Sequence, residues 1–255
     1  MSKIYRYISF HSFVDTIQRR KLTFIHPSLW DDPFELYFLQ QEIKSQIIKS
    51  NGNFSDALGA ILQYIVSNKT YAQAWTSLNE SDSLWRIYSH GGTSVRISTD
   101  RNKISLLDDV KIFDVKYVKR YKPTITNNKD FIELIGTKRE AFSHEKEVRL
   151  VKYNKFSDMD DANKHITAFL ALNGMDKYFD NIEIENIKEK VEELVKKINQ
   201  NIQTKIQYIR FETVDNFIES VMLNPFAPDW FDDTLQFFCK KNNLKYLGRS
   251  KLYKR

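Results

Sequence analysis

The chain has 255 residues, of which 42% are hydrophobic and 14% aromatic, enough apolar material for a sizeable core and too much for a disordered protein. Its formal net charge of +6 suits nucleic acid, a nucleotide or an acidic protein as a partner, and it equally serves solubility. The single cysteine, Cys239, excludes an intrachain disulfide and fits a reducing compartment. The first residues lack the apolar core of a signal peptide, and no stretch reaches the roughly 18 apolar residues of a membrane span. We therefore expect a cytoplasmic protein without membrane contact.

The N-terminal part of the chain is predicted to mix short strands and short helices. Alternating apolar residues indicate strands at 3–10, 21–25, 71–78 and 91–99. Apolar residues at helical spacing indicate helices at 11–20, 36–48, 56–66 and 81–89. The segment 26–35 is predicted to be a loop, because Pro27 and Pro33 both resist regular structure.

The C-terminal part continues the same mixture. Strands are predicted at 110–118, 145–153, 205–211, 217–223 and 244–248. Helices are predicted at 131–142, 182–202 and 232–241, with a less regular helical segment at 160–180. In the strand at 110–118 the apolar alternation slips phase near Phe113, which predicts either a bulge or a crossing between layers.

The order of these elements predicts the fold class. Strands and helices are mixed without a regular βαβ rhythm, and 7 Gly and 5 Pro are too few for a turn-dense sandwich. We therefore expect an α+β fold with mixed, mainly antiparallel sheets and packed helices. No linker or internal repeat divides the chain, so we expect one domain over residues 1–255 with a helical insertion around 156–204.

Several common catalytic motifs are absent from the sequence. There is no glycine-rich phosphate loop and no Gly-x-Ser-x-Gly nucleophile turn. The five histidines and the lone cysteine show no zinc-ligand spacing, so no metal site is expected from them. These absences exclude the commonest hydrolases and nucleotide kinases, but they leave enzymes whose sites are assembled from scattered residues.

Two stretches in the first quarter of the chain carry candidate binding residues. In "YRYIS", Arg6 can offer a guanidinium to a phosphate, and Tyr5 and Tyr7 can stack or hydrogen-bond; the same stretch also fits an ordinary edge strand. In "LWDDPFE", the acidic residues can cap the next helix or, with other carboxylates, bind a metal ion.

Two later stretches complete the set of candidates. In "WTSLNESDSLWRIYSHGG", Ser77 ends a strand, while Trp85 and Tyr88 fit a helix whose aromatics serve either the core or a ligand. In "EKEVRL", alternation from Glu145 places Glu145, Glu147 and Arg149 on one strand face. That face is either a solvated surface or a pair of catalytic carboxylates.

The order of these stretches, followed by "VMLNPFAPDW", resembles a large bacterial family of unknown function found among toxin and phage-defence genes. The resemblance covers nearly the whole chain, and its most specific parts are the Trp-x-x-Tyr helix and the Glu-x-Glu-x-Arg strand. Asp31 departs from it, since Asn is usual before Asp-Pro, and so does Ala74, where Cys is common.

More distantly, the motif order is similar to that of the ADP-ribosyltransferases. This resemblance implies an ADP-ribosyltransferase-like fold and NAD as a substrate, bound by Arg6, Tyr5 and Tyr7, with Ser77 supporting the nicotinamide ribose. It implies Glu147 as the catalytic glutamate and Glu145 as the residue that activates the acceptor. We add Trp85 and Tyr88 as candidate cofactor-binding residues.

The resulting expectation is an NAD-dependent ADP-ribosyltransferase toxin, held in check by an antitoxin or chaperone protein, with nucleic acid or protein as acceptor. Two alternatives from other classes stay open. One is a non-catalytic nucleic-acid-binding or sensing module. The other is a metal-dependent nuclease that uses carboxylates of "LWDDPFE" and "EKEVRL", namely Asp31, Asp32, Glu35, Glu145 and Glu147.

Overall fold

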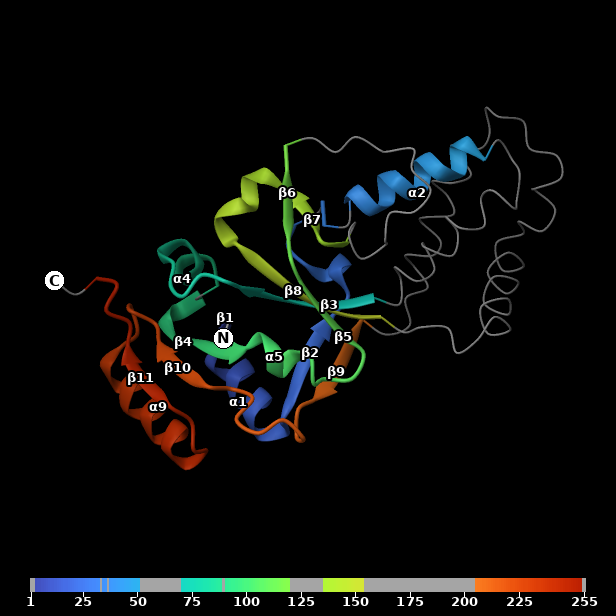
Figure 1. Ribbon diagram of the computed structural model, residues 1–255. Coiled ribbons are helices and arrows are strands. Elements are labelled where there is room, and N and C mark those ends of the chain that lie inside the picture. The colour runs from blue at the N-terminus through green and yellow to red at the C-terminus, as the bar shows by residue number, and fades with distance from the viewer. Residues whose placement is uncertain are drawn as a thin grey trace.

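The computed structural model describes most of the chain (Figure 1). The described residues are 3–32, 34–35, 37–50, 70–88, 90–119, 135–153 and 205–253. The helices predicted at 56–66 and 182–202, the segment 160–180 and the insertion at 156–204 lie outside them. In the described part, no helix is long and apolar enough to cross a membrane.

Nine strands of the described part form one sheet, and all but one of its pairings are antiparallel. These strands are β1 (Lys3–Ser9), β2 (Lys21–Ile25), β3 (Thr70–Thr76), β4 (Ser94–Asp100), β5 (Val110–Asp114), β8 (Glu147–Tyr153), β9 (Ile206–Arg210), β10 (Ser220–Leu223) and β11 (Tyr246–Arg249). A second, parallel sheet consists of β6 (Lys116–Val118) and β7 (Thr137–Arg139). The expected α+β class with a mixed, mainly antiparallel sheet is confirmed.

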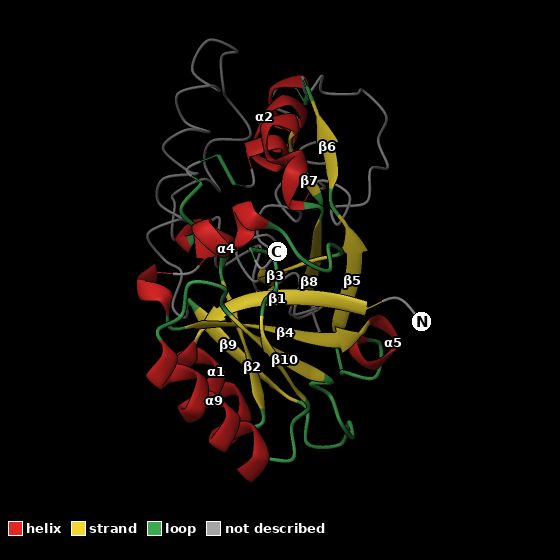
Figure 2. Ribbon diagram, turned by 90° about the vertical axis from the view of Figure 1, so that its left-hand side faces the viewer, coloured by secondary structure: helices red, strands yellow, loops and turns green. Residues whose placement is uncertain are grey.

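Helices cover both faces of the large sheet (Figure 2). The α-helices are α1 (Phe10–Arg19), α2 (Tyr37–Lys49), α4 (Asp82–Tyr88), α5 (Arg101–Ile104) and α9 (Asp229–Lys241), and the 3-10 helices are η1 (Pro27–Leu29), η2 (His90–Gly92) and η3 (Glu140–Glu145). On one face, Phe10 of α1 packs edge-on against Phe231 of α9, with ring centroids 5.0 Å apart. On the other face, Tyr7 of β1 packs against Trp85 of α4 at 4.7 Å. Ile4 and Ile8 of β1 belong to the core cluster on the first face and Tyr7 to the cluster on the second, so the alternation of β1 supplies both layers.

The large sheet branches at β3, and the branch creates space. Along one edge, β3 pairs with β8 over its whole length. Along the other edge, it meets β1 only where Thr76 lies opposite Tyr5, and β2 only where Ala72 lies opposite Ile25. The middle of β3 thus has no strand beside it on that edge in the described part of the chain, because β1 and β2 diverge there.

Two sequence expectations need correction. In the described part of the helix predicted at 131–142, Ile135 is helical, but β7 and η3 replace the helix from Thr137 onward. Parallel pairing with β6, including the Lys116 N–H bond to Gly136 O at 2.7 Å, overrides local helix propensity there. The strand predicted from Glu145 begins at Glu147, because Lys146 takes a left-handed conformation (φ 44°) that ends the 3-10 turn. The phase slip near Phe113 is confirmed as a crossing between the two sheets, from β5 to β6.

Candidate functional site

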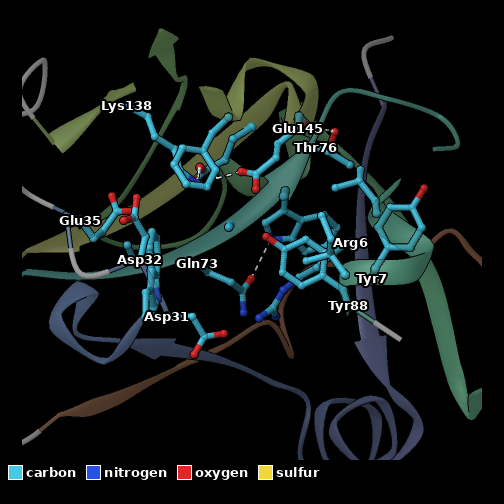
Figure 3. A pocket seen from close by; sticks show the side chains of 18 of the residues that line it. Arg6, Tyr7, Asp31, Asp32, Glu35, Gln73, Thr76, Tyr88, Lys138 and Glu145 are labelled. Atoms are coloured by element: carbon cyan, nitrogen blue, oxygen red, sulfur yellow. Dashed lines mark hydrogen bonds and ion pairs between the residues drawn. The ribbon is translucent and has the colours of Figure 1, made fainter. Parts of the chain in front are cut away.

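A cavity of about 380 Å³ lies where β1 and β3 diverge, within the size range of small-molecule sites. Its walls come from β1, β3, α4, the loop after β2, and the β7–η3–β8 segment. Among the residues that line it are Tyr5, Arg6, Tyr7, Trp30, Asp31, Asp32, Glu35, Gln73, Thr76, Tyr88, Lys138, Phe142, Glu145 and Glu147. In Figure 3, Asp31, Asp32 and Glu35 lie on one side of the pocket, while Arg6, Tyr7 and Tyr88 lie on the other.

The sheet register brings the first and last strands of the site together. Tyr5 of β1 lies opposite Thr76 of β3, and Thr76 lies opposite Glu147 of β8. The Thr76 hydroxyl donates to the carbonyl of Glu145 at 2.7 Å, which fixes the turn before β8. Segments 140 residues apart in the sequence thus meet in one row across three strands.

Both glutamates of "EKEVRL" reach the same ammonium group. Lys138 Nζ lies 2.8 Å from Glu145 Oε2 and 3.2 Å from Glu147 Oε2. Glu145 reaches it from the end of η3 and Glu147 from the first position of β8, so the two carboxylates converge although they do not share a strand. The two carboxylates therefore lie together as expected, but they do so because η3 turns into β8 and not because they alternate along one strand.

Arg149 lies below Glu147 in the side of the cavity that Glu145 and Glu147 line, which we call the β8 wall. Its side chain is fully buried and binds Glu147 Oε1 through Nε at 2.8 Å and Glu35 Oε1 through Nη1 at 2.7 Å. Its guanidinium lies under the ring of Trp30, 4.7 Å from the centroid. The loop predicted at 26–35 is therefore tied to β8 by an ion pair and a cation–π contact.

These contacts set the ionisation of the wall. Burial alone would raise the pKa of Glu147, but Arg149 and Lys138 hold it below its usual value, so Glu147 is ionised at neutral pH. Burial likewise opposes the charge of Lys138, yet Glu147 and Glu145 raise the pKa of Lys138 above its usual value. Burial raises the pKa of Glu35, against the pull of Arg149.

The side of the cavity that β1 lines, the β1 wall, carries the cation Arg6, which has no ion-pair partner among the described residues. Arg6 is half-buried at the cavity and forms no hydrogen bond or ion pair within the part of the chain that the structure describes. Loss of water around it lowers the pKa of Arg6 to about 10, which still leaves it charged at neutral pH. An unpaired guanidinium facing a cavity is suited to a phosphate or a carboxylate of a ligand.

The aromatic candidates divide between the cavity and the core. Tyr5 stacks with Arg96, whose guanidinium lies 4.7 Å from the ring centroid. Tyr7 accepts a hydrogen bond from the N–H of Ser81 at 3.1 Å and packs on Trp85, so it joins β1 to α4. Burial, together with the carboxylate of Glu145, raises the pKa of Tyr88 to about 12 at the cavity.

Six of the eight predicted site residues line the cavity, and two do not. Trp85 is fully buried beneath it, with its indole N–H bonded to Glu80 at 2.9 Å. Ser77 is exposed just beyond β3, and its hydroxyl donates to the carbonyl of Lys146 at 3.3 Å. Its neighbour Thr76 takes the cavity-facing position, because the chain alternates sides at this point.

Sequence reasoning missed Lys138 altogether. It lies inside the segment predicted as helix, and no local pattern marks it as a partner of Glu145 and Glu147. Only the pairing of β6 with β7 brings it to the cavity.

The carboxylates around the cavity bind cations of the protein rather than one another. Besides the pairs above, Asp32 binds Arg139 at 2.9 Å. Within the described residues, no group of three or more His, Cys, Asp or Glu side chains is arranged to hold a metal ion. Of the five acids considered for a metal-dependent nuclease, four are distributed among three different cations, and the fifth, Asp31, is exposed.

Compared with protein-family models, with curated proteins and with solved structures, the chain matches none of them.

Proposed function

We propose that this chain is an ADP-ribosyltransferase, which cleaves the bond between nicotinamide and ribose in NAD and transfers ADP-ribose to an acceptor. The observation that carries the proposal is one cavity with two opposed features: paired, cation-bound carboxylates on one wall and an unpaired guanidinium on the other. The row Tyr5–Thr76–Glu147 supports it, because an early, a middle and a late strand meet in the order that the resemblance to ADP-ribosyltransferases requires.

Arg6 is the residue that would bind the diphosphate of NAD. A diphosphate needs a positively charged donor that no protein carboxylate already occupies, and Arg6 meets this condition in the described structure. Tyr5 and Tyr88 also line the cavity and would contact the sugar or the ring. The middle-strand role goes to Thr76 rather than Ser77.

Glu147 would stabilise the reacting ribose. As the C1′–nitrogen bond breaks, its electron pair leaves with neutral nicotinamide and positive charge develops on the ribose. Glu147 is ionised and held on both oxygens, so it needs no reorganisation to face that charge. The acceptor then forms the new bond to C1′ and gives up its proton to Glu145, which contacts the same lysine as Glu147.

The loop after β2 would keep water from the reaction. Trp30 and Glu35 of this loop both contact Arg149. Asp32 of the same loop binds Arg139, so three contacts fasten the loop to the β8 wall. We further propose nucleic acid as the acceptor, in keeping with the net charge of +6, and an antitoxin or chaperone protein that restrains the activity in the cell.

The test is release of nicotinamide from NAD by the purified chain, alone and with RNA, DNA or protein from a cell extract. We expect release by the wild type and a loss of roughly 100-fold or more in Glu147→Gln, because a preorganised charge in the transition state is removed. Glu140→Gln is the matched control, since Glu140 opens the 3-10 helix that precedes β8 but is exposed. Thermal unfolding of each variant checks that it is folded.

Two outcomes would overturn the proposal. If folded wild type releases no nicotinamide under any condition yet binds RNA or DNA, the chain is a binding module. If it cuts nucleic acid without NAD and stops when chelator is added, it is a metal-dependent nuclease. Stimulation of release by one pool identifies the acceptor class.

A further inference from the structure

Lys138 is the only cation that contacts Glu145 in the described part of the chain, and it contacts Glu147 as well. Its ammonium group is nearly buried and lies 4.6 Å from the centre of the Phe142 ring, which holds it in place from one side. The next residue of β7, Arg139, binds Asp32. A single lysine therefore joins the two acids of the site.

The two acids are held unequally. Glu147 has Arg149 on Oε1 and Lys138 on Oε2, so both oxygens are fixed. Glu145 has Lys138 on Oε2, whereas its Oε1 has no hydrogen-bond partner among the described residues. One carboxylate is thus locked, and the other keeps an oxygen that can receive a proton.

The two carboxylates lie 2.8 Å and 3.2 Å from one ammonium nitrogen, and they would repel each other if that ammonium group were removed. Without a cation between them, their repulsion would make one retain a proton well above the usual range for an acid. The other charged or titratable groups around the pair are Glu35 and Asp31 of the loop, Tyr88 of α4, Tyr117 of β6 and Arg149 of β8. Of these only Arg149 is a cation, and it binds Glu147 and Glu35 but not Glu145.

We propose that Lys138 is a positioning residue of this site: its ammonium group holds the Glu145 and Glu147 carboxylates together against their mutual repulsion and leaves Glu145 Oε1 as the proton acceptor. Lys138 itself is protonated and bound on two sides, so it serves as neither nucleophile nor base. The catalytic half of this inference rests on the proposed function, whereas the electrostatic half concerns the protein alone.

The electrostatic half is tested without NAD. Carboxyl carbons of glutamate are labelled with ¹³C, and their NMR shifts are followed from pH 4 to 9 in wild type and Lys138→Met, with Glu145→Gln and Glu147→Gln to assign the signals. We expect one carboxyl of the pair to titrate between about pH 5 and 8 in Lys138→Met but not in wild type. Lys138→Arg should restore the wild-type pattern, because it restores the cation.

The matched control is Lys119→Met. Lys119 lies 4.0 Å from Glu140 in an exposed pair beside the same 3-10 helix. Its loss should leave all glutamate titrations unchanged, since water screens that pair. If Lys138→Met is folded and both carboxyls stay ionised through this range, Lys138 has no such role.

The catalytic half is tested by nicotinamide release over the same pH range. In Lys138→Met we expect the maximal rate at pH 6 to fall roughly 100-fold and to recover partly as pH rises, because the base must lose its proton first. KM for NAD should change little, and Lys138→Arg should recover most of the rate. A rate that is low at every pH with no rising limb would overturn the role in catalysis.

The two failures are distinguishable. If wild type releases no nicotinamide but Lys138→Met shows the new titration, the proposed function is wrong while the electrostatic role of Lys138 stands. If wild type is active and Lys138→Met shows neither the titration nor the pH limb, the inference is wrong while the proposed function stands.

Discussion

The two walls of the cavity use charge in opposite ways. On the β8 wall, Glu145, Glu147 and Arg149 are buried and joined to cations or anions of the protein. On the β1 wall, the charge of Arg6 has no such partner in the described structure. Buried charges are tolerated when they are paired, so the first wall is built for a fixed geometry. A partly buried charge without a partner, such as that of Arg6, lowers the stability of the fold. A ligand that carries the opposite charge would offset this cost when it binds.

Of the changes considered, Arg149→Met should lower the free energy of unfolding the most. The change leaves Glu147 and Glu35 buried without their common cation, and breaking a buried pair in this way costs about 3–5 kcal/mol of unfolding free energy. Urea denaturation measures it. The control is Arg101→Met, whose partner Asp114 is exposed; we expect a loss below about 1 kcal/mol there, and equal losses would contradict the distinction.

Arg6→Gln, a change on the β1 wall, should weaken ligand binding without lowering the stability of the fold. No protein ion pair is lost, so the unfolding free energy should stay unchanged or rise slightly. Affinity for ADP-ribose should fall roughly 10- to 100-fold, the equivalent of about 1.5–3 kcal/mol for a hydrogen bond to a charged group. Calorimetry measures the affinity. Arg210→Gln, a change at an exposed arginine outside the cavity, should leave it unaffected.

Acid should weaken the β8 wall. Because the pKa of Glu147 is lower in the folded chain than in the unfolded one, its ion pairs stabilise the fold fully above the unfolded value and are lost as pH falls through the folded value. Unfolding free energy should therefore decline below about pH 5, and Glu147→Gln should decline less over that interval. Denaturation at a series of pH values tests this; parallel curves would mean that Glu147 does not carry the effect.

The smallest effect should come from the contact that fastens the loop to the cavity. Arg139 lies 4.5 Å from the Phe34 ring centre and 5.1 Å from that of Phe142, and it binds Asp32. Arg139→Gln should cost about 0.5–1 kcal/mol and speed amide exchange in residues 26–35. Arg86→Gln removes a similar contact with Phe226 and should leave exchange in that loop unchanged.

Much of the scaffold follows from local patterns. The alternation in "KIYRYIS" placed Ile4 and Ile8 in the main core, and Val148 and Leu150 did the same for β8. Candidate site residues were found where polar or aromatic types interrupt such patterns, as at Arg6, Tyr88 and Glu147. The helix predicted at 131–142 is wrong from Thr137 onward, because a parallel strand partner outweighs helix propensity there.

The sequence by itself determined most of the strands, their buried faces and the α+β class, because periodicity depends only on neighbouring residues. It did not determine β7, which falls in a segment predicted as helix. Only the tertiary structure decided which charges are paired. Arg149 meets Glu35 across 114 residues, and Lys138 lies between Glu145 and Glu147 because β7 carries it there. Arg6 has no ion-pair partner among the described residues. Pairing depends on which distant segments pack together, and no spacing along the chain encodes that.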